Sequence, residues 1–216
     1  MVRLLETTLI RIGNEEYLKT NRSVGLSTMR DRHVAVRRGV LHFKFRGKGG
    51  KRHEIDLEDP RLARIVRRTQ ELPGQELFQY VDDDGGTQKI SSTDVNAYLR
   101  EIAGAEFSAK DFRTWAGTVL AALALREFEQ SRNRTQARRN LVAAIENVAR
   151  RLGNTPAICR KCYIHPAIME SYLDGKTVDL LKTRAATALH TAGSGLSAEE
   201  KAVLAFLQKR LRASPI

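Results

Sequence analysis

The sequence has few cysteines. Cys159 and Cys162 are the only two among 216 residues. Two cysteines cannot form the disulfide framework of a small secreted protein, and they fall two ligands short of an all-cysteine zinc site. We therefore expect reduced thiols and no bound metal.

Long apolar runs are also absent. No run approaches the roughly 20 residues that cross a bilayer, and residues 1–6 lack the apolar stretch of a signal peptide. We therefore expect a cytoplasmic protein that has no membrane partner.

Acidic residues are in the minority, because 25 Asp and Glu stand against 37 Lys and Arg, for a formal charge of +12. Residues 1–52 hold 13 basic and 4 acidic residues and residues 126–161 hold 9 and 3, whereas residues 53–125 hold 8 and 13. Two separated basic stretches suit a protein that surrounds a polyanion such as duplex DNA. Two solvated basic faces are the alternative that composition leaves open.

The residue pattern predicts a mainly α-helical chain with a small β-sheet near the N-terminus. Apolar spacing predicts a helix over residues 3–12 that ends at Gly13, followed by a short helix that carries Tyr17. Residues 32–57 alternate and are rich in β-branched residues, which predicts a three-stranded antiparallel sheet with turns at 37–39 and 47–50. We expect one α+β domain over residues 1–216.

After Pro60 the pattern is helical, with surface loops expected near Pro73-Gly74 and at residues 82–86. Capping boxes predict three helix starts, at Ser91, Ser108 and Ser197.

Local signals also place the segment around Tyr163. A helix over residues 134–152 should end at Gly153, and Thr155-Pro156 should begin a short helix with Tyr163 at or just beyond its end. Small residues at 185–195 predict a linker. A last helix, at about 197–212, should carry one apolar face, formed by Val203, Leu207 and Leu211.

Four short segments form an ordered set of residues suited to phosphate chemistry. They are LIRIGNEEY with Arg11, FRGK with Lys48, KDFRT with Arg113, and LGNTP with Asn154, which runs on to RKCY and Tyr163. This ordered Arg, Lys, Arg, Asn, Tyr series resembles that of the small viral and bacterial type IB DNA topoisomerases. The resemblance covers nearly the whole chain and identifies it as a poxvirus-like catalytic domain.

The resemblance implies an isomerase that relaxes supercoiled duplex DNA. Tyr163 would attack a backbone phosphorus, form a 3′-phosphotyrosyl intermediate and expel the 5′-hydroxyl end. The cut strand would rotate and then be resealed. Because the phosphotyrosyl ester keeps the energy of the broken bond, this DNA breaking and rejoining would need neither ATP, nor a metal, nor any other cofactor.

The chemistry of the matched residues agrees with these roles. A phenol with a pKa of about 10 is a poor nucleophile at neutral pH unless cations favour the phenolate. Arg11 and Arg113 would supply such cations and bind the two non-bridging phosphate oxygens with their planar guanidinium groups. The helix start at Ser108 would add backbone amides that favour an anion near Arg113.

Lys48 and Asn154 complete the catalytic set that the resemblance implies. Lys48 would protonate the leaving 5′-oxygen from a hairpin tip whose glycines allow close approach to DNA. Asn154 stands where many relatives carry histidine, and its amide can donate a hydrogen bond but cannot titrate. We therefore expect Asn154 to bind phosphate and not to transfer a proton.

The resemblance further assigns DNA contacts to Tyr17, Thr28 and Lys110. It implies double-stranded DNA as the partner, a monomer that acts as a clamp, and a place at the bacterial nucleoid. Relatives carry a smaller β-rich domain before the helix with the first arginine, whereas ten residues precede Arg11 here. We therefore expect that the N-terminal half of the clamp is absent.

Two other functions use the same scaffold. A tyrosine recombinase has the same nucleophile, but its second arginine belongs to a His-x-x-Arg motif. Here the corresponding residues are Lys110-Asp111-Phe112-Arg113, which favours the topoisomerase. A non-catalytic DNA-binding module is the other alternative, and the intact catalytic series argues against it.

Overall fold

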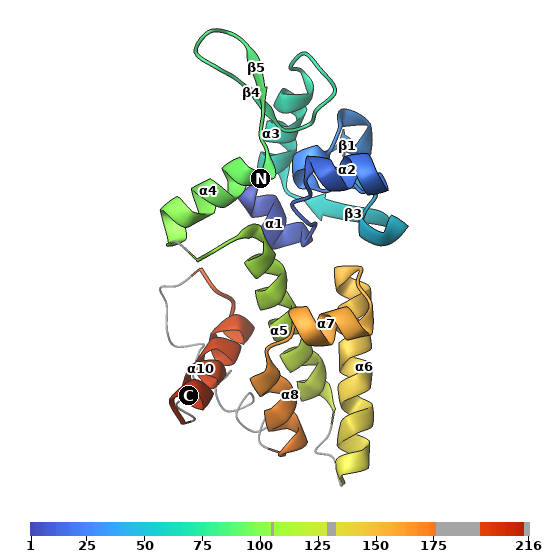
Figure 1. The fold of residues 1–216 in the computed structure, drawn as a ribbon, viewed down its shortest axis with the longest axis vertical. Helices are drawn as coiled ribbons and strands as arrows, with labels where there is room; N and C mark the ends of the chain where they lie inside the picture. The colour runs from blue at the N-terminus through green and yellow to red at the C-terminus, as the bar shows by residue number, and fades with distance from the viewer. Residues whose placement is uncertain (105, 129–132, 176–194, 214–216) are drawn as a thin grey trace. The chain divides into compact units, whose positions relative to one another are not determined.

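The structure, a computed structural model, describes residues 1–104, 106–128, 133–175 and 195–213. It confirms the predicted α+β class, with many helices and one three-stranded antiparallel sheet near the N-terminus (Figure 1). The chain groups into two compact units, Met1–Phe112 and Arg113–Ile216, where the sequence led us to expect one domain. The boundary falls inside helix α5 (Ala109–Glu127).

The first unit begins with two short helices. Helix α1 (Val2–Thr8) buries Leu4 and Leu5. It ends four residues before the predicted end at residue 12, because Leu9 adopts the left-handed conformation with φ 56°. Helix α2 (Glu15–Asn21) is the predicted short helix that carries Tyr17, and the Asn14 side chain caps it by accepting a hydrogen bond from the Tyr17 amide.

The predicted sheet is confirmed. Strands β1 (Val34–Arg37), β2 (Val40–Arg46) and β3 (Arg52–Glu58) pair antiparallel in that order. Arg38 and Gly39 both take positive φ, as a two-residue hairpin turn demands. One face of β2 is buried in the core of the unit and consists of Leu41, Phe43 and Phe45.

Helix α3 (Pro60–Gln70) packs against β1 and β2 and buries Ala63 and Val66. The chain then forms a hairpin of β4 (Gln79–Val81) and β5 (Thr87–Lys89), whose turn is the predicted loop at 82–86. The hairpin itself was not predicted, because its three-residue strands are mostly exposed and lack apolar alternation. Helix α4 (Ser92–Ala103) starts at the predicted Ser91 capping box.

The second unit is helical in the part that the structure describes. Helix α6 (Arg134–Leu152) packs against α7 (Pro156–Cys162) and α8 (Pro166–Leu173). Its predicted buried stripe is confirmed and consists of Leu141, Ile145, Val148 and Leu152. No helix among the described residues combines the length and the apolar character needed to cross a membrane.

The last helix, α10 (Ala198–Ala213), begins after the predicted Ser197 cap and packs against α8. Of the three residues predicted to form its apolar face, Val203 and Leu207 are buried, as is Phe206, whereas Leu211 is 55% exposed. The predicted linker at 185–195 lies, except for its last residue, outside the described residues.

Two glycines hold the segment of Arg11 against the 3-10 helix Leu26–Thr28. A Cβ atom on Gly25 would lie 2.5 Å from Gly13 Cα and 2.7 Å from the Arg11 carbonyl oxygen. The Leu26 amide donates a hydrogen bond of 2.9 Å to that same carbonyl. Close backbone packing therefore fixes the position of the Arg11 backbone, to which its side chain is attached.

We predict that Gly25→Ala lowers the free energy of unfolding by about 1–3 kcal/mol, because the new methyl group must push backbone atoms apart. Urea unfolding followed by circular dichroism measures this. Gly195→Ala is the matched control, since a Cβ atom at Gly195 meets nothing within 4 Å. Equal stability of the two variants would contradict the prediction.

Candidate active site

Arg113 connects the end of helix α6 to the ring of Tyr163. Its side chain is buried, with 4% exposed. Nη2 donates a hydrogen bond of 2.7 Å to the carbonyl oxygen of Leu152, the last residue of α6. Its Cζ lies 5.1 Å from the centroid of the Tyr163 ring, within the range of a cation–π interaction. The guanidinium is thus held beside the phenol by a helix end whose carbonyls carry partial negative charge.

The turn after α6 fixes the backbone of Asn154. Gly153 takes φ 60°, and its amide donates to the Arg150 carbonyl oxygen at 3.1 Å. The Asn154 amide donates to the Ala149 carbonyl oxygen at 2.8 Å. Together these two bonds form a Schellman motif. The predicted end of α6 at Gly153 is confirmed.

Tyr163 is the C-cap residue of α7, where the sequence placed it. Thr155 caps the start of that helix by accepting a hydrogen bond from the Ile158 amide, as predicted. The Tyr163 amide donates to the Cys159 carbonyl oxygen at 3.0 Å. The side chain is half-buried at the end of a short helix that is capped at both ends.

Two residues of α5 that the sequence analysis missed position the Tyr163 backbone. A Cβ atom on Gly117 would lie 2.5 Å from the Tyr163 carbonyl oxygen and 3.1 Å from its Cβ. Thr118 Oγ1 donates to the Thr114 carbonyl oxygen at 2.8 Å, lies 3.4 Å from the Tyr163 carbonyl oxygen, and accepts a hydrogen bond of 3.1 Å from the His165 amide. A glycine inside a helical pattern was the available signal, since it often marks a close contact.

In the first unit, Lys48 and Tyr17 lie together. Lys48 stands in the 3-10 turn Lys48–Gly50 between β2 and β3, and this turn contacts α2. Its Nζ lies 4.8 Å from the centroid of the Tyr17 ring. Lys48 is exposed, and Tyr17 is 44% exposed. The predicted proton donor Lys48 and the predicted DNA-contacting residue Tyr17 are therefore in contact and open to solvent.

Thr28, by contrast, is buried with 1% of its surface exposed. Its Oγ1 donates to the Gly25 carbonyl oxygen at 3.2 Å and accepts from the Gly25 amide at 3.0 Å. The hydroxyl thus stabilises the turn that packs against the Arg11 segment. Its predicted contact with DNA stays a prediction, and the geometry adds a supporting role behind Arg11.

The start of α5 has partners within the protein for two of its amides, and its predicted attraction for a phosphate stays a prediction. Asp111 accepts hydrogen bonds from the Ser108 amide and hydroxyl, which confirms the predicted cap. The Ala109 amide donates to the Asn96 side chain at 2.9 Å. These donors are satisfied within the protein, so the hydrogen bond to Leu152, not the helix start, positions the Arg113 guanidinium. Lys110, in the first turn, is exposed.

The two cysteines next to Tyr163 are thiols and do not form a disulfide. Cys159 is fully buried, whereas Cys162 is partly buried. Among the residues that the structure describes, no group of three or more His, Cys, Asp or Glu side chains is arranged to hold a metal ion.

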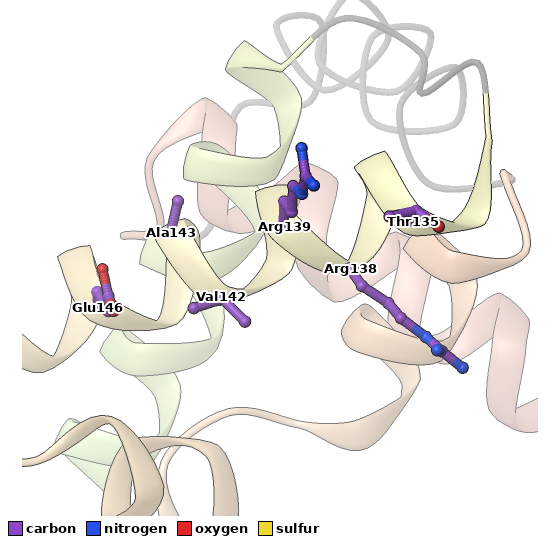
Figure 2. Close-up of a pocket in the computed structure, with 6 residues that line it drawn as sticks. All are labelled: Thr135, Arg138, Arg139, Val142, Ala143 and Glu146. Carbon is purple, nitrogen blue, oxygen red and sulfur yellow. The ribbon is translucent and has the colours of Figure 1, made fainter.

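An open depression lies on the exposed side of α6 and is lined by Thr135, Arg138, Arg139, Val142, Ala143 and Glu146 (Figure 2). Arg138 and Arg139 point in different directions there (Figure 2). A small-molecule site has polar groups that converge on an enclosed volume. The depression lacks that convergence and contains none of the predicted site residues.

Comparison with known proteins gives consistent matches. The family model described as the eukaryotic DNA topoisomerase I catalytic core matches residues 1–188. The chain is 31% identical to DNA topoisomerase 1B of Acanthamoeba polyphaga mimivirus over 179 residues, which are 80% of this chain and 53% of the relative. It is 26% identical to DNA topoisomerase I of monkeypox virus over 184 residues, 82% of this chain and 54% of the relative. The chain thus spans about half the length of these relatives.

We predict that Gly117→Ala lowers the rate of covalent adduct formation with duplex DNA at least about tenfold, because its methyl group must displace Tyr163, and small misplacements of a reacting group cost rate. Alanine also favours a helix by about 1 kcal/mol over glycine, so we do not expect the lower rate of adduct formation to result from unfolding of the variant. Single-turnover cleavage and thermal melting are measured together. A wild-type cleavage rate in a folded variant would refute this role of the Gly117 contact.

Proposed function

Since the chain belongs to the family of the eukaryotic DNA topoisomerase I catalytic core, we propose that it relaxes supercoiled duplex DNA by breaking and rejoining one strand. The observation that supports this best is the buried Arg113 guanidinium, held over the Tyr163 ring by the Leu152 carbonyl. A fixed cation beside a phenol favours the phenolate that must attack phosphorus.

In the proposed reaction Tyr163 loses its phenolic proton to solvent, and its oxygen bonds to a backbone phosphorus while the bond from phosphorus to the 5′-oxygen breaks. Lys48 gives a proton to the departing 5′-oxygen and takes it back when that hydroxyl attacks the phosphotyrosyl ester. Arg11 and Arg113 bind the non-bridging oxygens, on which charge grows in the transition state. The number of phosphoester bonds is conserved, so no nucleotide is consumed.

Asn154 binds the same phosphate as a neutral donor in this proposal. Its backbone is fixed by the Schellman hydrogen bond to Ala149, so binding a phosphate there does not require ordering this part of the chain. Tyr17, Thr28 and Lys110 contribute contacts to the DNA backbone. The active form is a monomer that clamps double-stranded DNA at the bacterial nucleoid.

We predict that the protein relaxes a negatively supercoiled plasmid in the presence of EDTA and without ATP, and that Tyr163→Phe abolishes both relaxation and the covalent protein–DNA adduct. Gel electrophoresis of topoisomers and denaturing gels of the adduct measure these results. Tyr98→Phe is the matched control, since Tyr98 is half exposed on α4, and it should keep full activity. Relaxation by Tyr163→Phe would exclude the proposed nucleophile.

The recombinase and binding-module alternatives give other results in the same assay. A recombinase would join strands of two duplexes, and a binding module would shift DNA on a native gel without forming an adduct.

We predict that Asn154→Ala slows single-turnover cleavage about 10- to 1000-fold, which is the usual loss when one hydrogen-bond donor to a transition-state oxygen is removed. Alanine keeps the backbone amide that bonds to Ala149, so stability should change little. Asn154→His should retain more activity than Asn154→Ala, because histidine can also donate. Asn147→Ala, on the exposed side of α6, is the control. An unchanged rate for Asn154→Ala removes it from the catalytic set.

A further inference from the structure

The exposed face of the β2–β3 ladder carries polar pairs in a definite register. Lys44 lies opposite Glu54, with Nζ and Oε1 2.7 Å apart, and His42 lies opposite Asp56, with Nδ1 and Oδ1 2.8 Å apart. The next pair toward the hairpin loop is Arg46 opposite Arg52. Two complementary pairs are thus followed by one pair of like charge.

Nothing in the described part of the chain neutralises this arginine pair. Neither Arg46 nor Arg52 forms an ion pair there, and both side chains are exposed. Like charges directly opposite each other destabilise an antiparallel pair of strands. An arrangement that costs stability in the free protein suggests that an anion binds it.

The Arg46 side chain is ordered over the hairpin loop. A Cβ atom on Gly50 would lie only 2.8 Å from Arg46 Nη2, so the guanidinium packs against the bare glycine backbone. The loop is closed by a hydrogen bond of 2.8 Å from the Gly47 amide to the Lys51 carbonyl oxygen. The arginine pair therefore stands at the base of the loop that carries Lys48.

We propose that Arg46 and Arg52 together bind one backbone phosphate of duplex DNA, separate from the phosphate that Tyr163 attacks. This inference rests on the proposed function, because it places the pair beside Lys48 on the same DNA. Planar guanidinium groups suit a phosphate oxygen pair, and the phosphate removes the repulsion between the two arginines. The pair holds the DNA strand against the hairpin so that Lys48 can reach its target oxygen.

The test compares three variants that each remove one positive charge, namely Arg46→Gln, Arg52→Gln and Lys44→Gln. Lys44 is the matched control, because it is on the same strand and face but is paired with Glu54. Binding to a fluorescent 24-base-pair duplex is measured by anisotropy over a range of salt concentrations. All proteins also carry Tyr163→Phe, so that binding stays reversible.

We expect each arginine variant to bind the duplex about 5- to 10-fold more weakly at low salt, and the slope of log K against log salt to become shallower by about 0.9, the value for one lost phosphate contact. Lys44→Gln should change affinity less than about twofold and leave the slope unchanged. If all three variants lose affinity equally, the effect is one of net charge, and the proposed phosphate site is wrong.

A charge reversal gives a second readout. Arg52→Glu should raise the melting temperature of the DNA-free protein by about 1–4 °C, because it places a carboxylate opposite Arg46. The same change should weaken duplex binding more than tenfold. A lower melting temperature would mean that the arginine pair stabilises the fold, and would overturn the proposal.

The outcome is separable from that of the proposed function. Plasmid relaxation by the protein with Tyr163 intact tests the function, whereas the difference between the arginine variants and Lys44→Gln tests the phosphate site. Relaxation without that difference rejects the site alone. The difference without relaxation supports a DNA-binding hairpin on a protein that does not relax DNA.

Discussion

The hydrogen bond from Arg113 to the Leu152 carbonyl is the contact on which the second unit's part of the site depends. Burying a guanidinium costs several kcal/mol unless its donors find partners. Here the partner is a carbonyl at the negative end of α6, and the Tyr163 ring adds a cation–π contact. Because one buried side chain contacts both the helix end and the Tyr163 ring, the position of Tyr163 relative to the cation is set by where α6 ends.

That stopping point is itself fixed by backbone chemistry. Gly153 reaches the left-handed conformation without the steric cost that other residues meet, and the Schellman bonds satisfy two carbonyls of the last turn. The Leu152 carbonyl remains for Arg113, and Asn154 follows directly in a fixed conformation. A single glycine therefore determines the backbone placement of two candidate catalytic residues, because the end of α6 holds Arg113 and the turn that follows holds Asn154.

Local signals were enough to predict much of this arrangement. A few consecutive residues are enough to predict the helix end at Gly153, the helix start at Thr155-Pro156 and the cap at Ser108, because the hydrogen bonds of each join neighbouring residues. The sequence could not give the contacts of Arg113 with Leu152 or of Thr118 with Tyr163, which join residues 39 and 45 positions apart. The exposure of Leu211 could not be predicted either, since helical spacing identifies a face but packing decides how far along the helix that face is covered.

The candidate site residues of the two units differ in how exposed their positive charges are. Arg113 is buried and hydrogen-bonded, so its guanidinium is held in one position and solvent screens its charge little. Lys48, Arg46 and Arg52 gather at the exposed end of a hairpin whose other ladder pairs include no second pair of arginine or lysine residues. A fold selected only for stability would have continued the alternation of Lys44 and Glu54 to the loop. The break in that alternation occurs beside Lys48, where a phosphate would turn the repulsion into binding, and local rules of stability are most often broken at functional sites.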